Sequence, residues 1–116
     1  MQIETREQAG VTILDLSGRL DGGPESRAIH ETVKKTLEGG GKRIALNMTD
    51  VPWANTLGIG ILIAAFVSAK RMDAQLKLFG TSERVSASLK MMRLIPEIFD
   101  DLAGESAAIE SFGGTR

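Results

Sequence analysis

The side chains that could take part in catalysis are few in this chain of 116 residues. The sequence contains no cysteine and a single histidine, His30, which lies among the polar residues of an expected amphipathic helix. A nucleophile with its base, a carboxylate pair and a metal cluster each need partner residues that the sequence does not supply at a workable spacing. We therefore expect no catalytic residue, no metal site and no cofactor, and we interpret His30 as a partly exposed structural residue.

Two closely spaced glycines, Gly58 and Gly60, follow the polar pair Asn55-Thr56 at an expected strand-to-helix turn. They resemble a phosphate-binding loop only superficially, because the pattern lacks a third glycine, a lysine and an acidic ribose ligand. A glycine inside a helix costs about 1 kcal/mol relative to alanine. The pair therefore predicts that something comes close to this backbone, either a neighbouring element of the same fold or a partner.

The charge and composition of the chain exclude several classes of function. Fourteen basic and fifteen acidic residues give a formal net charge of −1, which offers no strong field for nucleic acid or an anionic membrane. Residues 1–7 lack an apolar signal core, and the longest uncharged apolar run, 57–69, is shorter than the roughly 20 residues of a membrane span. With no cysteine present, we expect a cytoplasmic protein that binds no nucleic acid and inserts into no membrane.

Hydrophobic periodicity and turn residues divide the chain into alternating strands and helices. Two extended runs, 2–5 and 11–17, flank Gln8-Ala9-Gly10 and predict a hairpin. An amphipathic helix begins at Pro24 and ends at the glycines 39–41. The later elements are expected to be a strand at 43–48, a helix at 56–72, a strand at 75–79, a helix at 83–92 capped by Ser82, a closing segment at 95–102 and one short final helix.

Strands that are separated by helices must pair in parallel, and their crossovers are right-handed. The expected fold is therefore a single α/β domain over 1–116, with its core at about 3–112. We expect a mixed sheet of roughly four to five strands that begins with the hairpin, with about four helices packed on it. Loops that leave parallel strands at their carboxyl ends gather on one edge of the sheet, so Asp21 and Gly22 should lie near the Asn55-Thr56 turn.

The helix expected at 56–72 is apolar on almost every side and has no charged residue before Lys70. A sheet covers only one face of a helix, so part of the first turns should remain as an exposed apolar patch, which is a normal mark of a protein-binding surface. The alternative is that the neighbouring helices cover these residues. We expect Thr56 itself to be exposed at the start of this helix.

Five segments, in order along the chain, resemble the STAS domain family and specifically the bacterial anti-sigma factor antagonists. These segments are Ser17-Gly18-Arg19-Leu20-Asp21, Asn47-Met48-Thr49-Asp50-Val51, Asn55-Thr56-Leu57-Gly58-Ile59-Gly60, Gly80-Thr81-Ser82-Glu83-Arg84-Val85 and Leu94-Ile95-Pro96-Glu97-Ile98-Phe99. The resemblance covers about 3–112 and depends on the ordered set, because no single segment would suffice. It implies the STAS fold and a role in transcription regulation without enzymatic activity.

The resemblance also implies partner switching. In that family the unphosphorylated domain binds an anti-sigma factor that is also a serine/threonine kinase, phosphorylation by the kinase reverses the binding, and a serine/threonine phosphatase resets it. The family's turn commonly has the sequence Asp-Ser-Ser-Gly, with the phosphate on the first serine, and Thr56 occupies that position here. The residues expected to bind the partner are Asp21, Gly22, Asn55, Thr56, Leu57, Gly58, Ile59 and Gly60.

Two departures from the family turn keep a second hypothesis open. Asn55 replaces the aspartate, and Leu57 replaces the second serine. On this hypothesis the chain is a constitutive, unphosphorylated STAS scaffold or interaction module in a signalling or transporter assembly.

Overall fold

The N-terminal hairpin is present and is longer than the sequence pattern predicts. In the computed structural model, which describes residues 1–113, β1 (Gln2–Gln8) pairs antiparallel with β2 (Val11–Ser17). β1 extends beyond residue 5 because its backbone pairing with β2 continues through polar residues. The two-residue turn, Ala9-Gly10, has φ angles of 54° and 80°, and such left-handed pairs match the twist of a hairpin.

Three further strands join the hairpin in parallel. β3 (Arg43–Asp50) lies next to β2, β4 (Gln75–Phe79) lies next to β3, and the two-residue β5 (Asp101–Leu102) completes the order β1-β2-β3-β4-β5. The helices of the described residues are α1 (Pro24–Glu38), α2 (Thr56–Arg71), α3 (Glu83–Met91) and α4 (Glu105–Ser111). The predicted α/β class, with a mixed sheet, an N-terminal hairpin and four helices, is confirmed.

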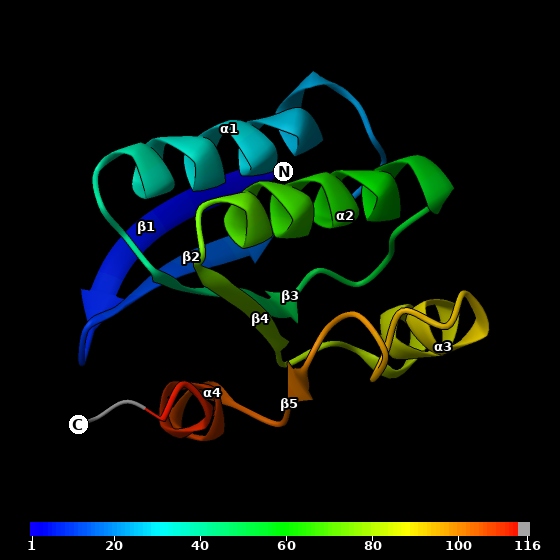
Figure 1. Cartoon of the computed structure of the whole chain (residues 1–116). Coiled ribbons are helices and arrows are strands. Elements are labelled where there is room, and N and C mark those ends of the chain that lie inside the picture. Colours follow the sequence, from blue (N-terminus) through cyan, green and yellow to red (C-terminus); the bar gives the residue numbers. More distant parts are fainter. Residues whose placement is uncertain (114–116) are drawn as a thin grey trace.

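Helices cover both faces of the sheet (Figure 1). α1 and α2 pack side by side on one face, where Leu14 belongs to the larger hydrophobic core. α4 lies on the opposite face, where Val11 and Ile13 pack against Ala108 and Phe112. The alternating residues of β2 are therefore buried on both sides of the sheet, as is usual for a strand that has helices on both faces.

The closing segment expected at 95–102 is mostly irregular backbone. The sequence predicted a closing segment over 95–102, but only β5 pairs with β4, and 92–100 consists of turns and irregular backbone. Phe99 is nevertheless fully buried, and its ring meets that of Phe66 edge to face with the centroids 5.4 Å apart. Hydrophobic residues of this closing segment thus anchor an irregular stretch of backbone.

An ionic cluster ties α4 to the hairpin. Arg6 Nε lies 2.7 Å from Asp15 Oδ2, and Arg6 Nη2 lies 2.7 Å from Glu105 Oε1. Asn47 Nδ2 donates a further hydrogen bond to Asp15 Oδ1 at 2.8 Å. The hydrogen bonds from Arg6 lower the pKa of Asp15 and of Glu105, so both carboxylates stay charged at neutral pH and stabilise the docked helix.

We expect Glu105→Gln to lower the free energy of unfolding by about 0.5–1 kcal/mol near neutral pH, because it removes one of two partly exposed ion pairs. The pKa of Glu105 is lower in the folded chain than in the unfolded one, so its stabilising effect is complete above the unfolded value of about 4.3. The effect is lost as the pH falls through the folded value. Urea denaturation at about pH 7 and about pH 2.5 should show a larger difference at the higher pH.

The control for this experiment is Glu110→Gln, which changes an exposed residue of the same helix. It should leave the free energy of unfolding unchanged at both pH values. An equal loss for Glu105→Gln at the two pH values would show that the ion pair does not hold α4.

Candidate functional site

Asn55 caps α2 and holds the turn that leads into it from β3. Its backbone is extended (φ −106°, ψ 179°), and its side-chain oxygen accepts a hydrogen bond from Gly58 N at 2.8 Å. Its Nδ2 donates to the carbonyl oxygen of Asp21 at 3.2 Å, and its backbone N–H donates to the carbonyl oxygen of Leu20 at 3.1 Å. Asn55 therefore joins the start of α2 to the segment that follows β2.

Gly58 lies where the first turn of α2 meets the segment after β2. A Cβ at this position would lie 2.0 Å from the carbonyl oxygen of Leu20, so a larger residue fits only if the backbone moves. Gly22, with φ of +87°, is close to the same turn, because a Cβ there would lie 2.5 Å from Cβ of Leu57. The loop around Gly22 is therefore near the start of α2, as the sequence predicted.

Gly60 has no neighbour of this kind. Among the described residues, no atom outside its own helix backbone and chain neighbours lies within 4 Å of a Cβ built at Gly60, and the residue is exposed on the outer side of α2. Packing within the fold therefore explains the first of the two glycines and leaves the second unexplained.

The Asp21 side chain holds its own loop. Its Oδ1 accepts hydrogen bonds from Gly23 N at 3.0 Å and from Ser26 Oγ at 3.3 Å. The hydrogen bond from Gly23 N–H, with a smaller effect from Ser26, lowers the pKa of Asp21, so the carboxylate is charged at neutral pH. Asp21 thus orders the connection between β2 and α1 while it remains exposed.

In the first turn of α2, some of the residues expected to bind a partner are exposed and others are buried. Thr56 is exposed, as the sequence predicted, and Leu57 is 70% exposed. Gly58 and Ile59 are buried, with Ile59 only 1% exposed. Only the outward residues of this turn are therefore available to a partner without movement of the helix.

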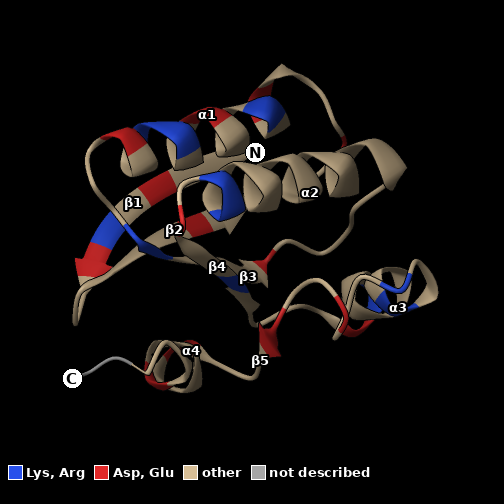
Figure 2. Cartoon of the chain, viewed as in Figure 1, with Lys and Arg blue, Asp and Glu red and all other residues tan. Residues whose placement is uncertain are grey.

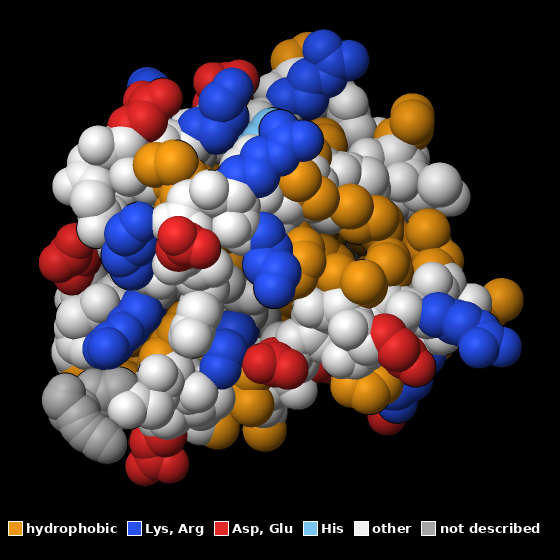
Figure 3. Space-filling view, in the orientation of Figure 1, with side chains coloured by type: hydrophobic (Ala, Val, Ile, Leu, Met, Phe, Trp, Pro, Cys, Tyr) orange, Lys and Arg blue, Asp and Glu red, His pale blue; other side chains and the backbone are white. Residues whose placement is uncertain are grey.

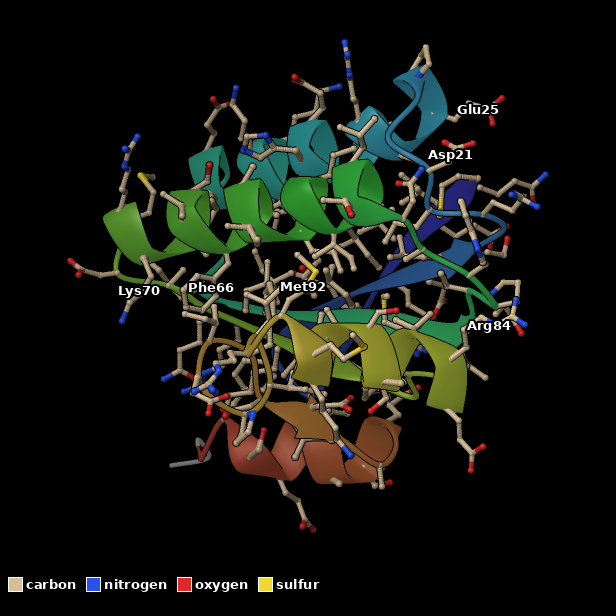
Figure 4. The ribbon with its side chains drawn as sticks, turned by 90° about the vertical axis from the view of Figure 1, so that its right-hand side faces the viewer. Asp21, Glu25, Phe66, Lys70, Arg84 and Met92 are labelled. Carbon is tan, nitrogen blue, oxygen red and sulfur yellow. The ribbon has the colours of Figure 1, made fainter. Side chains whose placement is uncertain are left out.

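A groove of about 320 Å³ lies between the start of α2 and the end of α3. It is lined by Trp53, Ala54, Asn55, Thr56, Ile59, Ser88, Met91 and Met92. Figure 3 shows hydrophobic side chains gathered around a hollow in this part of the molecule, and Figure 4 shows Met92 between the two helices. The guanidinium of Arg19 lies over the ring of Trp53, 4.2 Å from its centroid.

The outer side of α2 continues the apolar character of the groove. α1 packs against one side of α2 and the sheet covers another, but Val67 remains 39% exposed. The expected apolar patch is therefore present, and the covering by neighbouring helices is partial. We name the following residues the α2–α3 surface: Trp53, Leu57, Gly60, Ile63, Val67, Met91 and Met92.

Two residues of this surface, Met91 and Met92, were not identified from the sequence. They are 85% and 41% exposed, although methionine is usually buried. Val85 and Leu89, which are spaced four residues apart, are the buried residues of α3. Two consecutive methionines after Leu89 cannot both continue that inward face. This spacing was the signal in the sequence that at least one of them is exposed.

His30 does not belong to the groove. Its Nε2 lies 2.7 Å from Ser68 Oγ, a contact that joins α1 to α2. Within residues 1–113, no three acidic or histidine side chains converge in a way that could hold a metal ion. In the same part of the chain, no helix combines the length and the apolar character needed to cross a bilayer.

Comparison with known protein families and curated sequences gave one match. The family model described as "STAS domain" matches residues 2–105. A search of curated protein sequences found no match.

Solved structures share the fold at low sequence identity. A candidate anti-sigma factor antagonist from Thermotoga maritima has a TM-score of 0.86 at 19% identity, over 97% of this chain and 95% of that chain. The anti-sigma factor antagonist SpoIIAA in its unphosphorylated form has a TM-score of 0.81 at 17% identity, over 99% of both chains. Bacillus SpoIIAA in the phosphorylated form has a TM-score of 0.73 at 16% identity, over 96% of this chain and 99% of that chain.

A transporter domain is similar as well. The murine anion transporter Slc26a9, in its inward-facing state, has a TM-score of 0.78 at 17% identity, over 95% of this chain and 19% of the transporter. At these identities the similarity to each structure establishes the fold alone.

We expect Gly58→Ala to lower the free energy of unfolding by about 2–3 kcal/mol, because the added methyl group would overlap the carbonyl oxygen of Leu20. Gly60→Ala is the matched control in the same helix. Because its methyl group would enter open space, it should raise the free energy of unfolding by up to about 1 kcal/mol. Urea denaturation followed by circular dichroism measures both, and similar effects of the two substitutions would contradict the close backbone contact at Gly58.

Proposed function

Because the chain belongs to the STAS domain family, we propose that it is an anti-sigma factor antagonist. It binds an anti-sigma factor that is also a serine/threonine kinase, and so it regulates transcription in the cytoplasm by releasing a sigma factor. Phosphorylation of Thr56 by the kinase ends this binding, and a serine/threonine phosphatase restores it. The protein acts by docking and has no catalytic activity and no cofactor of its own.

The position of Thr56 is the observation that carries this proposal. Thr56 is an exposed hydroxyl residue at the first position of α2, and it lines the groove beside the exposed Leu57. A kinase can reach an exposed residue without unfolding the domain. The proposal is also supported by the fold that this chain shares with SpoIIAA, which has been solved in unphosphorylated and phosphorylated forms.

A phosphate on Thr56 would be tolerated by the folded domain. The first N–H groups of a helix are not bonded within it, and the helix dipole is positive at this end. The capping residue is the neutral Asn55, so its side chain would not repel the phosphate. An aspartate could also cap the helix, but only an amide can in addition donate to the carbonyl oxygen of Asp21.

The same phosphate would oppose docking. It would place between about 1.5 and 2 negative charges beside an apolar surface, where a partner must remove their water. The cost falls on the complex and not on the free domain. This asymmetry is what a binding switch requires.

A constitutive STAS module is the second candidate function. It is favoured by Leu57, which replaces a hydroxyl residue with an exposed apolar one, and by the similarity to the domain of Slc26a9. On this proposal the chain binds its partner regardless of any modification of Thr56.

We expect Thr56→Ala to keep the affinity for the anti-sigma factor kinase when ATP is added, whereas the unmodified chain should lose it. Thr56→Glu should bind more weakly from the start, by roughly 1–3 kcal/mol or about 5- to 150-fold, because the carboxylate must be dehydrated in the interface. Incubation with ATP and the kinase, followed by intact mass measurement and peptide mapping, should detect one phosphate on Thr56.

The matched control is Ser88→Ala, which removes another hydroxyl group of the same groove. This variant should still accept the phosphate and lose affinity with ATP. A phosphate found only on Ser17, Ser82 or another residue would refute the proposed switch. Tight binding without any phosphorylation would favour the constitutive module.

A further inference from the structure

Gly60 is a glycine that the fold does not need. It lies inside α2, where glycine is less stable than alanine, and a Cβ would meet open space. Gly58 in the same helix has a clear internal reason, the carbonyl oxygen of Leu20. A residue without a side chain on an exposed helix face allows another molecule to approach the helix backbone closely.

Gly60 lies on a mostly apolar face of α2, on which Val67 is exposed and Ile63 is partly buried against the core. Thr56, Gly60, Ile63 and Val67 follow the spacing of one helix face, and this face borders the groove. Met91 forms the opposite wall and is 85% exposed. Methionine side chains adapt their shape to a bound partner. The α2–α3 surface thus combines a groove that has an adaptable methionine wall with the exposed Gly60 on the adjoining face of α2.

Negative charge is scarce along the two helices that build this surface: α2 has no acidic residue in its first turn, and α3 has Glu83 at its start. Residues 51–72 and 84–96 contain no aspartate or glutamate, whereas the chain as a whole has fifteen acidic residues. The same two segments carry five cations, Lys70, Arg71, Arg84, Lys90 and Arg93. Lys90 lines a separate hollow with Glu83 and Asp101, and Arg71 lies on the side of α2 that faces α1. In Figure 2 the α2 ribbon is free of charged residues until its C-terminal end, and in Figure 4 Lys70 and Arg84 lie toward opposite ends of the two helices.

We propose that the α2–α3 surface binds an amphipathic helix of a protein partner, with an apolar face flanked by carboxylates, and that this helix approaches α2 most closely over Gly60. The apolar face would cover Leu57, Val67 and Met91, and the carboxylates would pair with cations toward the ends of the two helices, such as Lys70 and Arg84. The proposal rests on the proposed function in one respect, since it assigns this helix to the anti-sigma factor.

A protein helix fits this surface better than a membrane does. The surface is hollowed, and its groove includes the polar residues Asn55, Thr56 and Ser88. A bilayer would leave such a hollow unfilled, whereas side chains of a helix can enter it. An acidic partner also gives a phosphate on Thr56 a second effect, because it would repel carboxylates one helical turn away from Gly60.

A peptide titration tests the surface without the kinase. The probe is a synthetic peptide of about 18 residues with blocked ends, leucines on one helical face and glutamates on both flanks. A control peptide has lysines in place of the glutamates. Both are added to the full chain labelled with ¹⁵N and followed by NMR. We expect the glutamate peptide to shift residues of α2 and α3, and the lysine peptide to bind at least about tenfold more weakly.

Variants of Gly60 then locate the contact. Gly60→Leu should lower the affinity for the glutamate peptide by at least about tenfold, and Gly60→Ala should lower it by about threefold. Both substitutions should raise the melting temperature of the protein by a few degrees. A merely structural glycine would show the opposite pattern, with lower stability and unchanged binding. The matched control is Gly104→Ala, whose Cβ also meets open space but lies before α4, on the other face of the sheet.

Several outcomes would overturn the inference. These are equal binding of the two peptides, no binding of the glutamate peptide, shifts outside α2 and α3, or binding of phosphatidylglycerol vesicles but of neither peptide. If the kinase binds and Gly60→Leu leaves its affinity unchanged, the inference fails and the proposed function stands. If the glutamate peptide binds as expected and the kinase does not bind at all, the proposed function fails and the docking surface stands.

Discussion

The close contact between the first turn of α2 and the carbonyl group of Leu20 is the constraint on which the site depends. Gly58 permits this contact, because a Cβ would lie 2.0 Å from the carbonyl oxygen. The contact fixes the rotation of α2 about its axis, so that Leu62 and Ala65 face the sheet. Thr56 and Gly60 are then directed outward by the helical period. The outward face is thus a geometric consequence of the inward one.

Because α2 is apolar on most sides, this rotation leaves an exposed apolar surface. A helix that is apolar on nearly every side needs cover on nearly every side, and the sheet and α1 provide only part of it. The end of α3 stands opposite and adds Met91 and Met92 without closing the gap. Apolar area left in water represents roughly 25 cal/mol per Å² that can be recovered on association. Binding of a partner can therefore bury apolar area that folding leaves exposed.

The sequence predicted the positions of the helices and strands well, but it predicted less well which face of the sheet each helix covers. The glycines at 39–41 and the capping residue Ser82 predicted where helices end or begin, since these signals are local. The position of α4 on the opposite face was not predicted, because it depends on the long-range cluster of Arg6, Asp15 and Glu105. In the same way, local spacing could not separate the two glycines of α2. Their difference lies in the position of Leu20, far away in the sequence.

The separation of fold and surface explains how a modification at Thr56 could act on binding alone. The contacts that hold α2 come from its buried side, where Gly58, Ile59 and Leu62 lie. Thr56 shares none of this burial, and Asn55 caps the helix through a neutral side chain that a phosphate would not displace by charge repulsion. A charge added here changes what a partner must dehydrate while the packed core stays as it is. A residue inside the core could not be modified without destabilising the domain, so an exposed first turn is the position where a switch costs the fold least.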